Sequence, residues 1–136
     1  MERLGFAPQV VQAHGEGWAL EEIGYNEGRR VIMERAFSSN TIFCSNDRLA
    51  IGFLAAAYEL GLRVGREADC ALRVAGHDNH PVARFTCPTL TTISHDYARI
   101  ATKSVETMMA LIESGERGDT RQVTLFDGEL IMRASA

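Results

Sequence analysis

One stretch near the middle of the chain, residues 41–62, constrains the fold most strongly. It begins with a short apolar run at residues 41–44, followed by Ser-Asn-Asp at residues 45–47. The side chains of these three residue types accept hydrogen bonds from the free N–H groups at the start of a helix. The next residues are mostly apolar and end at Gly61, a residue type that favours the left-handed backbone after a helix. The stretch therefore predicts a buried strand, a polar turn and a helix.

The apolar residues of this predicted helix fall on two stripes. The first stripe contains Ala50, Leu54, Ala57 and Gly61, and the second contains Ile51, Ala55, Tyr58 and Leu62. A helix that covers a sheet needs only one such stripe. Because obligate subunit interfaces resemble a protein core cut in half, we interpret the second stripe as a subunit interface. Burial within the same chain is the alternative.

The segment before this unit predicts a second helix at residues 19–36, acidic at its start and basic later, as the helix dipole favours. Gly24 and Gly28 are spaced for a close approach of this helix to a neighbour. Residues 10–13 predict a short strand, and residues 1–8 the end of an earlier helix.

The segment after it predicts strands at residues 71–75 and 90–93 and an amphipathic helix at 96–113. The C-terminus is compatible with a hairpin at Asp127-Gly128 or with a loop that leads into a last strand at residues 130–133. Strand, helix and strand in this order form a parallel unit with a right-handed crossover. We therefore predict an α/β fold, with a parallel sheet flanked by helices.

Composition excludes several classes of protein. A chain of 136 residues suits one domain with a hydrophobic core. Its net charge of −4, without clusters of lysine and arginine, argues against nucleic-acid binding by these residues. No apolar run approaches the length of a membrane span, and the N-terminus does not resemble a signal peptide. Cys44, Cys70 and Cys87 do not form a CxxC motif. We expect them to be reduced and buried, and the protein to be cytoplasmic.

Two polar turns follow strands that are predicted to be neighbours, at residues 45–47 and 77–79. In open parallel sheets, ligands bind outside the carboxyl ends of the strands. We therefore expect Asn46 and Asp78 to face one crevice and to hold hydroxyl groups of a small polar ligand, with Trp18 supplying an aromatic face. The competing interpretations are a helix cap for Asn46, an ordinary turn for Asp78 and a core position for Trp18.

A metal site or a catalytic site is not favoured. His77, Asp78 and His80 lie close in sequence, but no further ligands at suitable spacing accompany them. Ser45 could meet His77 at the crevice, yet the chain has no GxSxG motif, no oxyanion-type glycine run and no phosphate-binding loop. We predict a binding protein without metal, cofactor or catalysis, and a small-molecule enzyme that uses His77 and Asp78 remains an alternative.

An ordered series of blocks resembles the C-terminal effector-binding region of lactose-repressor-type (LacI/GalR) bacterial transcription regulators. The blocks are GEGWALEEIGYNEG, CSNDRLAIG, VAGHDN and CPTLTTISHDYARIATKSVETMMALI. The resemblance implies a type I periplasmic-binding-protein fold, in which two lobes clamp a sugar, a sugar derivative or a nucleobase. It also implies that the regulator acts as a homodimer on operator DNA.

The resemblance assigns roles to individual residues. Asn46 and Asp78 would form hydrogen bonds with the effector, and Trp18 would stack on it. Ile51 and the segment that contains Arg84 and Phe85 match the dimer surface of the family. Together with the second stripe of the central helix, this gives a predicted interface of Ile51, Ala55, Tyr58, Arg84 and Phe85.

The chain departs from the family pattern in what it lacks. We expect residues 1–136 to be a partial effector-binding domain, without the helix-turn-helix, the hinge or most of the first lobe. The helix at residues 96–113 would pack on that missing lobe, and DNA would be contacted only through the absent helix-turn-helix. His77 stands where the family often has an aromatic residue. The alternative of a periplasmic solute-binding protein with the same fold is disfavoured by the unpaired cysteines.

Overall fold

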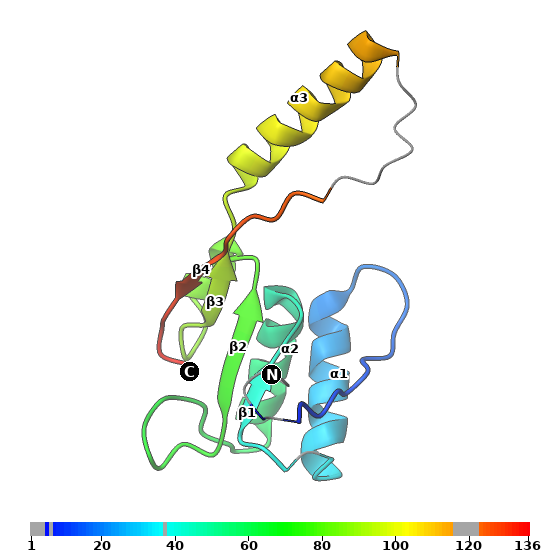
Figure 1. The fold of residues 1–136 in the computed structure, drawn as a ribbon. Coiled ribbons are helices and arrows are strands. Elements are labelled where there is room, and N and C mark those ends of the chain that lie inside the picture. The colour runs from blue at the N-terminus through cyan, green and yellow to red at the C-terminus, as the bar shows by residue number, and fades with distance from the viewer. Residues whose placement is uncertain (1–4, 6, 37, 116–122) are drawn as a thin grey trace.

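A computed structural model describes residue 5 and residues 7–36, 38–115 and 123–136. Its elements follow the predicted order (Figure 1). They are α1 (Leu20–Met33), β1 (Thr41–Phe43), α2 (Asp47–Glu59), β2 (Arg73–His77), the 3-10 helix η2 (Pro81–Arg84), β3 (Thr91–Ser94), α3 (Tyr97–Ser114) and β4 (Glu129–Ile131).

The strands form one sheet with the order β1-β2-β3-β4. β1, β2 and β3 are parallel, and β4 runs antiparallel to β3. The predicted parallel unit is therefore confirmed. The chain reaches β4 through a loop and not through a hairpin at Asp127-Gly128, and β4 begins one residue before the predicted strand.

α2 packs on one face of the sheet, and its first apolar stripe forms the centre of the core. Ala50, Leu54 and Ala57 are buried against Val74 of β2 and Leu90. α1 packs beside α2, as Figure 1 shows, on a face of α2 different from either predicted stripe. This face includes Phe53 and Ala56, both of which are buried.

The second stripe of α2 is only partly covered in this chain. Ile51 is half-buried, whereas Ala55 is exposed and 84% of the Tyr58 surface is accessible. Because α1 occupies a different face, it cannot cover these residues. Burial of the stripe within the same chain is therefore wrong for Ala55 and Tyr58, and a subunit interface stays a prediction.

α1 and α2 cross at a close distance because glycines form the contact. A Cβ atom added to Gly24 would lie 2.8 Å from the Cα atom of Leu49. One added to Gly28 would lie 3.1 Å from the Phe53 ring, and one added to Gly52 would lie 2.6 Å from the backbone nitrogen of Tyr25. The predicted close approach at Gly24 and Gly28 is confirmed, and Gly52 completes it from the other helix.

α2 begins and ends as predicted. The Asn46 side chain accepts a hydrogen bond from the N–H of Leu49 at 2.8 Å, so Asn46 caps the helix. Gly61 has a φ of 71°, and the N–H of Leu62 donates to the carbonyl of Ala57 at 2.9 Å. The end of α2 is thus a glycine-terminated Schellman motif.

α1 ends with the same pair of hydrogen bonds, but without a glycine. Arg35 has a φ of 50°, and its N–H donates to the carbonyl of Ile32 at 3.2 Å. The N–H of Ala36 donates to the carbonyl of Val31 at 2.9 Å. An arginine therefore occupies a left-handed position that favours glycine.

Two predictions made from short patterns are wrong. Residues 10–13 are irregular and Val10 is 85% exposed. This segment does not pair with a strand. Its neighbour Gln9 instead accepts a side-chain hydrogen bond from the N–H of Ser38 at 3.2 Å. Cys87 is exposed, because it lies in the surface loop before β3. The predicted helix end at residues 1–8 falls mostly outside the described residues.

α3 projects away from the sheet, as Figure 1 shows, and none of its residues is buried. Its predicted apolar stripe is accessible to solvent and includes Tyr97, Val105, Met108 and Ile112, which are 53–67% exposed. The returning chain contacts its polar side, where the Arg99 guanidinium lies 5.7 Å from the centre of the Phe126 ring. In the described part of the chain, no helix is both long and apolar enough to cross a membrane.

Candidate functional site

Three polar segments meet at one edge of the sheet. They lie at the carboxyl ends of β1, β2 and β3, and because these strands are parallel, their carboxyl ends share that edge. Two of the segments, at residues 45–47 and 77–79, are those predicted from the sequence. The third, at residues 94–96, was missed, although the predicted strand at 90–93 pointed to it.

Asn46 acts first as a helix cap. Its Oδ1 atom accepts the hydrogen bond from the N–H of Leu49, and the residue is partly buried. The cap interpretation is therefore correct. It leaves the side-chain NH2 group as the part of Asn46 that can donate a hydrogen bond to a ligand.

Asp47 is a fully buried carboxylate beside this cap, with 0% of its surface exposed. One carboxylate oxygen accepts a hydrogen bond from the Thr92 hydroxyl at 2.6 Å, and the other accepts from the N–H of His80 at 2.7 Å. Sequence reasoning treated Asp47 only as part of the turn. Its spacing from Ala50 and Leu54 places it on the buried stripe of α2, and this was the signal available.

Asp78 is held in an uncommon backbone conformation, with a φ of 108°. Its carboxylate lies 3.1 Å from Nδ1 of His77 and accepts a hydrogen bond from the Tyr97 hydroxyl at 3.3 Å. The side chain is 45% exposed. It can therefore accept further hydrogen bonds from a ligand that approaches this edge.

Two side chains that follow β3 complete the cluster. The Nε2 atoms of His95 and His77 lie 2.8 Å apart, and their ring centres are separated by 4.6 Å. The Tyr97 ring packs edge-on against His95 at 5.9 Å. Partial desolvation, and then the negative charge of Asp78, raises the pKa of the Tyr97 hydroxyl, so the proton that it donates to Asp78 is held more firmly than in a free tyrosine.

Trp18 lies in the loop before α1 and is 83% exposed, so a core position for it is wrong. The first turn of α1 is tied to the same end of the molecule, because Arg48 donates two hydrogen bonds of 2.6 Å to Glu21. Among the described residues, no hydrogen bond or ring contact joins Trp18 to Asn46 or Asp78. The structure thus brings Asn46 and Asp78 to one edge and places Trp18 near that end without contact.

The metal candidates do not form a cluster. His77 faces Asp78 and His95, whereas Nδ1 of His80 accepts a hydrogen bond from the N–H of Val82 at 3.2 Å and caps η2. Over the ranges that the structure describes, no group of three or more histidine, cysteine, aspartate or glutamate residues is placed to hold a metal ion.

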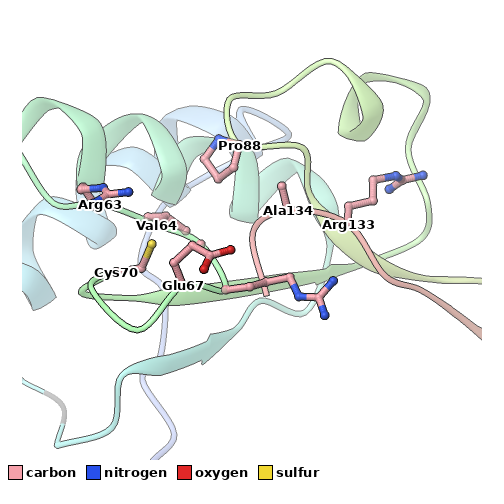
Figure 2. Close-up of a pocket in the computed structure, with 9 residues that line it drawn as sticks. Arg63, Val64, Glu67, Cys70, Pro88, Arg133 and Ala134 are labelled. Carbon is pink, nitrogen blue, oxygen red and sulfur yellow. The ribbon is translucent and has the colours of Figure 1, made fainter.

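Two hollows lie away from this edge. One, of about 700 Å³, is at the opposite end of the sheet, where Figure 2 shows Arg63, Glu67 and Cys70 among its lining side chains. The other, of about 460 Å³, lies between α3 and the returning chain. Neither contains Asn46 or Asp78.

Curated proteins similar to this chain are repressors. The HTH-type transcriptional repressor PurR of Pasteurella multocida is 31% identical over 120 residues, which is 88% of this chain and 34% of that protein. PurR of Haemophilus influenzae (strain PittEE) is 31% identical over 125 residues, covering 87% of this chain and 35% of the relative. The chain therefore spans about a third of the length of these relatives.

Solved structures with the same fold are also regulators. The lac repressor dimer bound to operator and the anti-inducer ONPF superposes with a TM-score of 0.68 at 27% identity, over 84% of this chain and 37% of that one. A LacI family regulator from Arthrobacter sp. FB24, in complex with lactose, gives 0.68 at 26% identity, over 85% and 41%. These proteins are transcription regulators and not enzymes.

The predicted fold class is confirmed, because the α/β sheet flanked by helices matches these structures. A family model covers all of residues 1–136, including the carboxyl edge that carries Asn46 and Asp78. The chain belongs to the periplasmic binding protein-like domain family.

Proposed function

We propose that this chain is the ligand-sensing and dimerisation portion of a LacI-type, DNA-binding transcription regulator of the cytoplasm. The family match and the repressors among the relatives support this proposal. The observation that carries it is the placement of Asn46 and Asp78 at one edge of the sheet. They are linked through Asp47, which follows Asn46 and binds the N–H of His80.

The effector is a small polar molecule: a sugar, a sugar derivative or a nucleobase. The NH2 group of Asn46 donates a hydrogen bond to it, and the half-exposed carboxylate of Asp78 accepts hydrogen bonds from its hydroxyl or N–H groups. The exposed Trp18 ring offers a flat apolar face that a sugar ring or a base can stack on. Lactose in the complex of the Arthrobacter regulator supports a sugar-type ligand.

The chain binds its effector without chemical change and does not itself contact the operator. Its net charge of −4 does not favour attachment to phosphates. In the lac repressor structure the operator is bound by a protein of which this chain covers 37%. DNA recognition therefore belongs to a different part of the regulator.

The regulator is a homodimer, and this chain contributes part of its interface. The interface residues are Ile51, Ala55, Tyr58, Arg84 and Phe85. Tyr58 and Phe85 are 84% and 79% exposed in the isolated chain, which is unusual for large aromatic side chains that lack a partner. The dimeric state of the lac repressor supports this assignment.

Calorimetric titration of the protein that carries this chain tests the proposal, with lactose, D-ribose and hypoxanthine as probes. Removal of the acceptor in Asp78→Ala should weaken binding by about 1–3 kcal/mol, as for the loss of a hydrogen bond to a charged group. Asp69→Asn is the matched control, because Asp69 pairs with Arg63 in the loop before β2. An affinity of Asp78→Ala equal to that of the unmodified protein would rule out the role of Asp78.

A further inference from the structure

The turn after β2 is held in a backbone conformation that it would not adopt alone. Asp78 and Asn79 have φ values of 108° and 51°, both in the left-handed region. This region is disfavoured for residues other than glycine, and aspartate and asparagine enter it mainly as single residues that local hydrogen bonds support. The surrounding structure must therefore supply interactions that fix this turn.

The interactions come from two buried side chains on other elements. The N–H of Asn79 donates to the Thr92 hydroxyl at 3.2 Å, and that hydroxyl donates to Asp47 at 2.6 Å. The second oxygen of Asp47 accepts from the N–H of His80 at 2.7 Å. Two consecutive backbone N–H groups, those of Asn79 and His80, are thus connected to the Asp47 carboxylate. The N–H of His80 binds it directly, and the N–H of Asn79 binds it through the Thr92 hydroxyl.

Burial makes these interactions hard to replace. Asp47 and Thr92 are both 0% exposed, so water cannot take over from a lost partner without a change in structure. Gly76 provides the space for the carboxylate, since a Cβ atom on residue 76 would lie 3.1 Å from the Cα atom of Asp47 and closer still to its carboxylate. The Asp47 carboxylate therefore depends on Thr92 for a hydrogen bond and on Gly76 for space.

The same carboxylate belongs to the element that carries Asn46. Asp47 is the first residue of α2, directly after the cap, while Thr92 lies on β3 and His80 follows β2. One side chain consequently joins the segments that follow β1 and β2, beside the backbone hydrogen bond of 2.9 Å from the N–H of Asp78 to the carbonyl of Ile93 on β3. The outer side of the turn is held separately, because Arg133 donates to the side chain of Asn79 at 2.8 Å.

We infer that Asp47 and Thr92 are positioning residues of the ligand-binding edge. They hold the turn at residues 78–80 so that the carboxylate of Asp78 faces the edge at a fixed distance from Asn46, without themselves touching the ligand. The effect on binding rests on the proposed function, in which Asp78 accepts hydrogen bonds from the effector. The effect of Asp47 and Thr92 on the conformation of the turn does not depend on the proposed function.

The first test is amide hydrogen exchange in Thr92→Val, which keeps the shape of the side chain and removes its hydroxyl. Exchange at the N–H of Asn79 should become about tenfold faster, as expected for one lost hydrogen bond. Ser135→Ala is the matched control, because Ser135 is also fully buried and bonded to β3 but not to the turn: its hydroxyl accepts from the N–H of Thr91 at 2.9 Å and donates to Val74 at 2.6 Å. Thr92→Ser should restore slow exchange. Equal exchange at Asn79 in Thr92→Val and Ser135→Ala would overturn the inference.

The second test is affinity for whichever of lactose, D-ribose and hypoxanthine binds the unmodified protein. Thr92→Val should bind it at least about fivefold more weakly, whereas Ser135→Ala and Thr92→Ser should stay within about twofold. Full affinity in Thr92→Val despite a loosened turn would refute the positioning role. If no probe binds, the proposed effector classes are wrong, and the exchange measurement alone decides whether Asp47 and Thr92 fix the turn.

Discussion

The crossing of α1 and α2 gives a sharp prediction for Gly52→Ala. A methyl group at residue 52 would lie closest to the carbonyl oxygen of Glu21, and 2.6 Å from the nitrogen of Tyr25 and 2.9 Å from the carbonyl carbon of Gly24. Optimal non-bonded separations of heavy atoms are about 3.5–4.0 Å, so the helices must separate by roughly 1 Å. The atoms that the methyl group meets belong to the backbone of α1 and cannot rotate away.

Two opposing terms set the magnitude. Replacement of glycine by alanine within a helix stabilises it by about 1 kcal/mol. Overpacking of a tight contact typically costs about 1–3 kcal/mol, and a rigid backbone contact favours the upper end of that range. We expect a net loss of about 2 kcal/mol in the free energy of unfolding. For a domain of this size that corresponds to a fall in Tm of roughly 6–10 °C.

Urea and thermal unfolding, followed by far-ultraviolet circular dichroism, measure this loss. Gly28→Ala is the matched control in the same interface. Its added methyl group would meet the Phe53 ring and the Ala56 methyl group at 3.1 Å and the Cα atom of Phe53 at 3.3 Å, which are looser contacts than those of a methyl group at residue 52. We expect Gly28→Ala to change the stability by less than about 1 kcal/mol. If Gly52→Ala is at least as stable as the unmodified protein, then contact between residue 52 and the α1 backbone does not set the distance between the two helices.

Three further predictions concern the surface of the chain. Arg35→Gly should raise the stability by about 1 kcal/mol in thermal unfolding, because Arg35 has a φ of 50°; a lower Tm would contradict this. Tyr58→Glu should shift the regulator from dimer to monomer in sedimentation velocity without loss of circular dichroism signal, and an unchanged profile would exclude Tyr58 from the interface. Burial raises the pKa of Cys44 to about 12, so at pH 8 its thiol stays protonated, whereas the Cys87 side chain is exposed and accessible to a reagent. A thiol reagent with mass mapping should therefore label Cys87 first, and faster labelling of Cys44 would refute this order.

Local patterns in the sequence predicted the parts of the fold that local interactions determine. The start of α2 at its Asn46 cap and its end at Gly61 depend on residues only a few positions apart. The buried stripe of α2 follows from helical periodicity in the same way. The strand predicted at residues 10–13 was wrong because a strand exists only through pairing with another strand, and apolar composition alone does not show whether a partner is available.

The location of the candidate site could be predicted from the sequence, but the hydrogen bonds within the site could not. Parallel strands bring Asn46 and Asp78 to one edge whatever lies between them. The partners of Asp47, by contrast, are 33 and 45 residues away along the chain, and no local pattern links them. His95 was missed for a related reason, since its place beside His77 follows from the register between β2 and β3.

The way α3 is attached has a mechanical consequence. The chain leaves the sheet after Ser94 and re-enters it at Glu129, and these two residues are paired neighbours in the ladder between β3 and β4. The described residues 95–115 and 123–128 therefore belong to an excursion that departs from the sheet and returns to it at one rung. Because none of the α3 residues is buried, α3 is joined to the sheet by this rung and by the contacts of His95 and Tyr97 with His77 and Asp78.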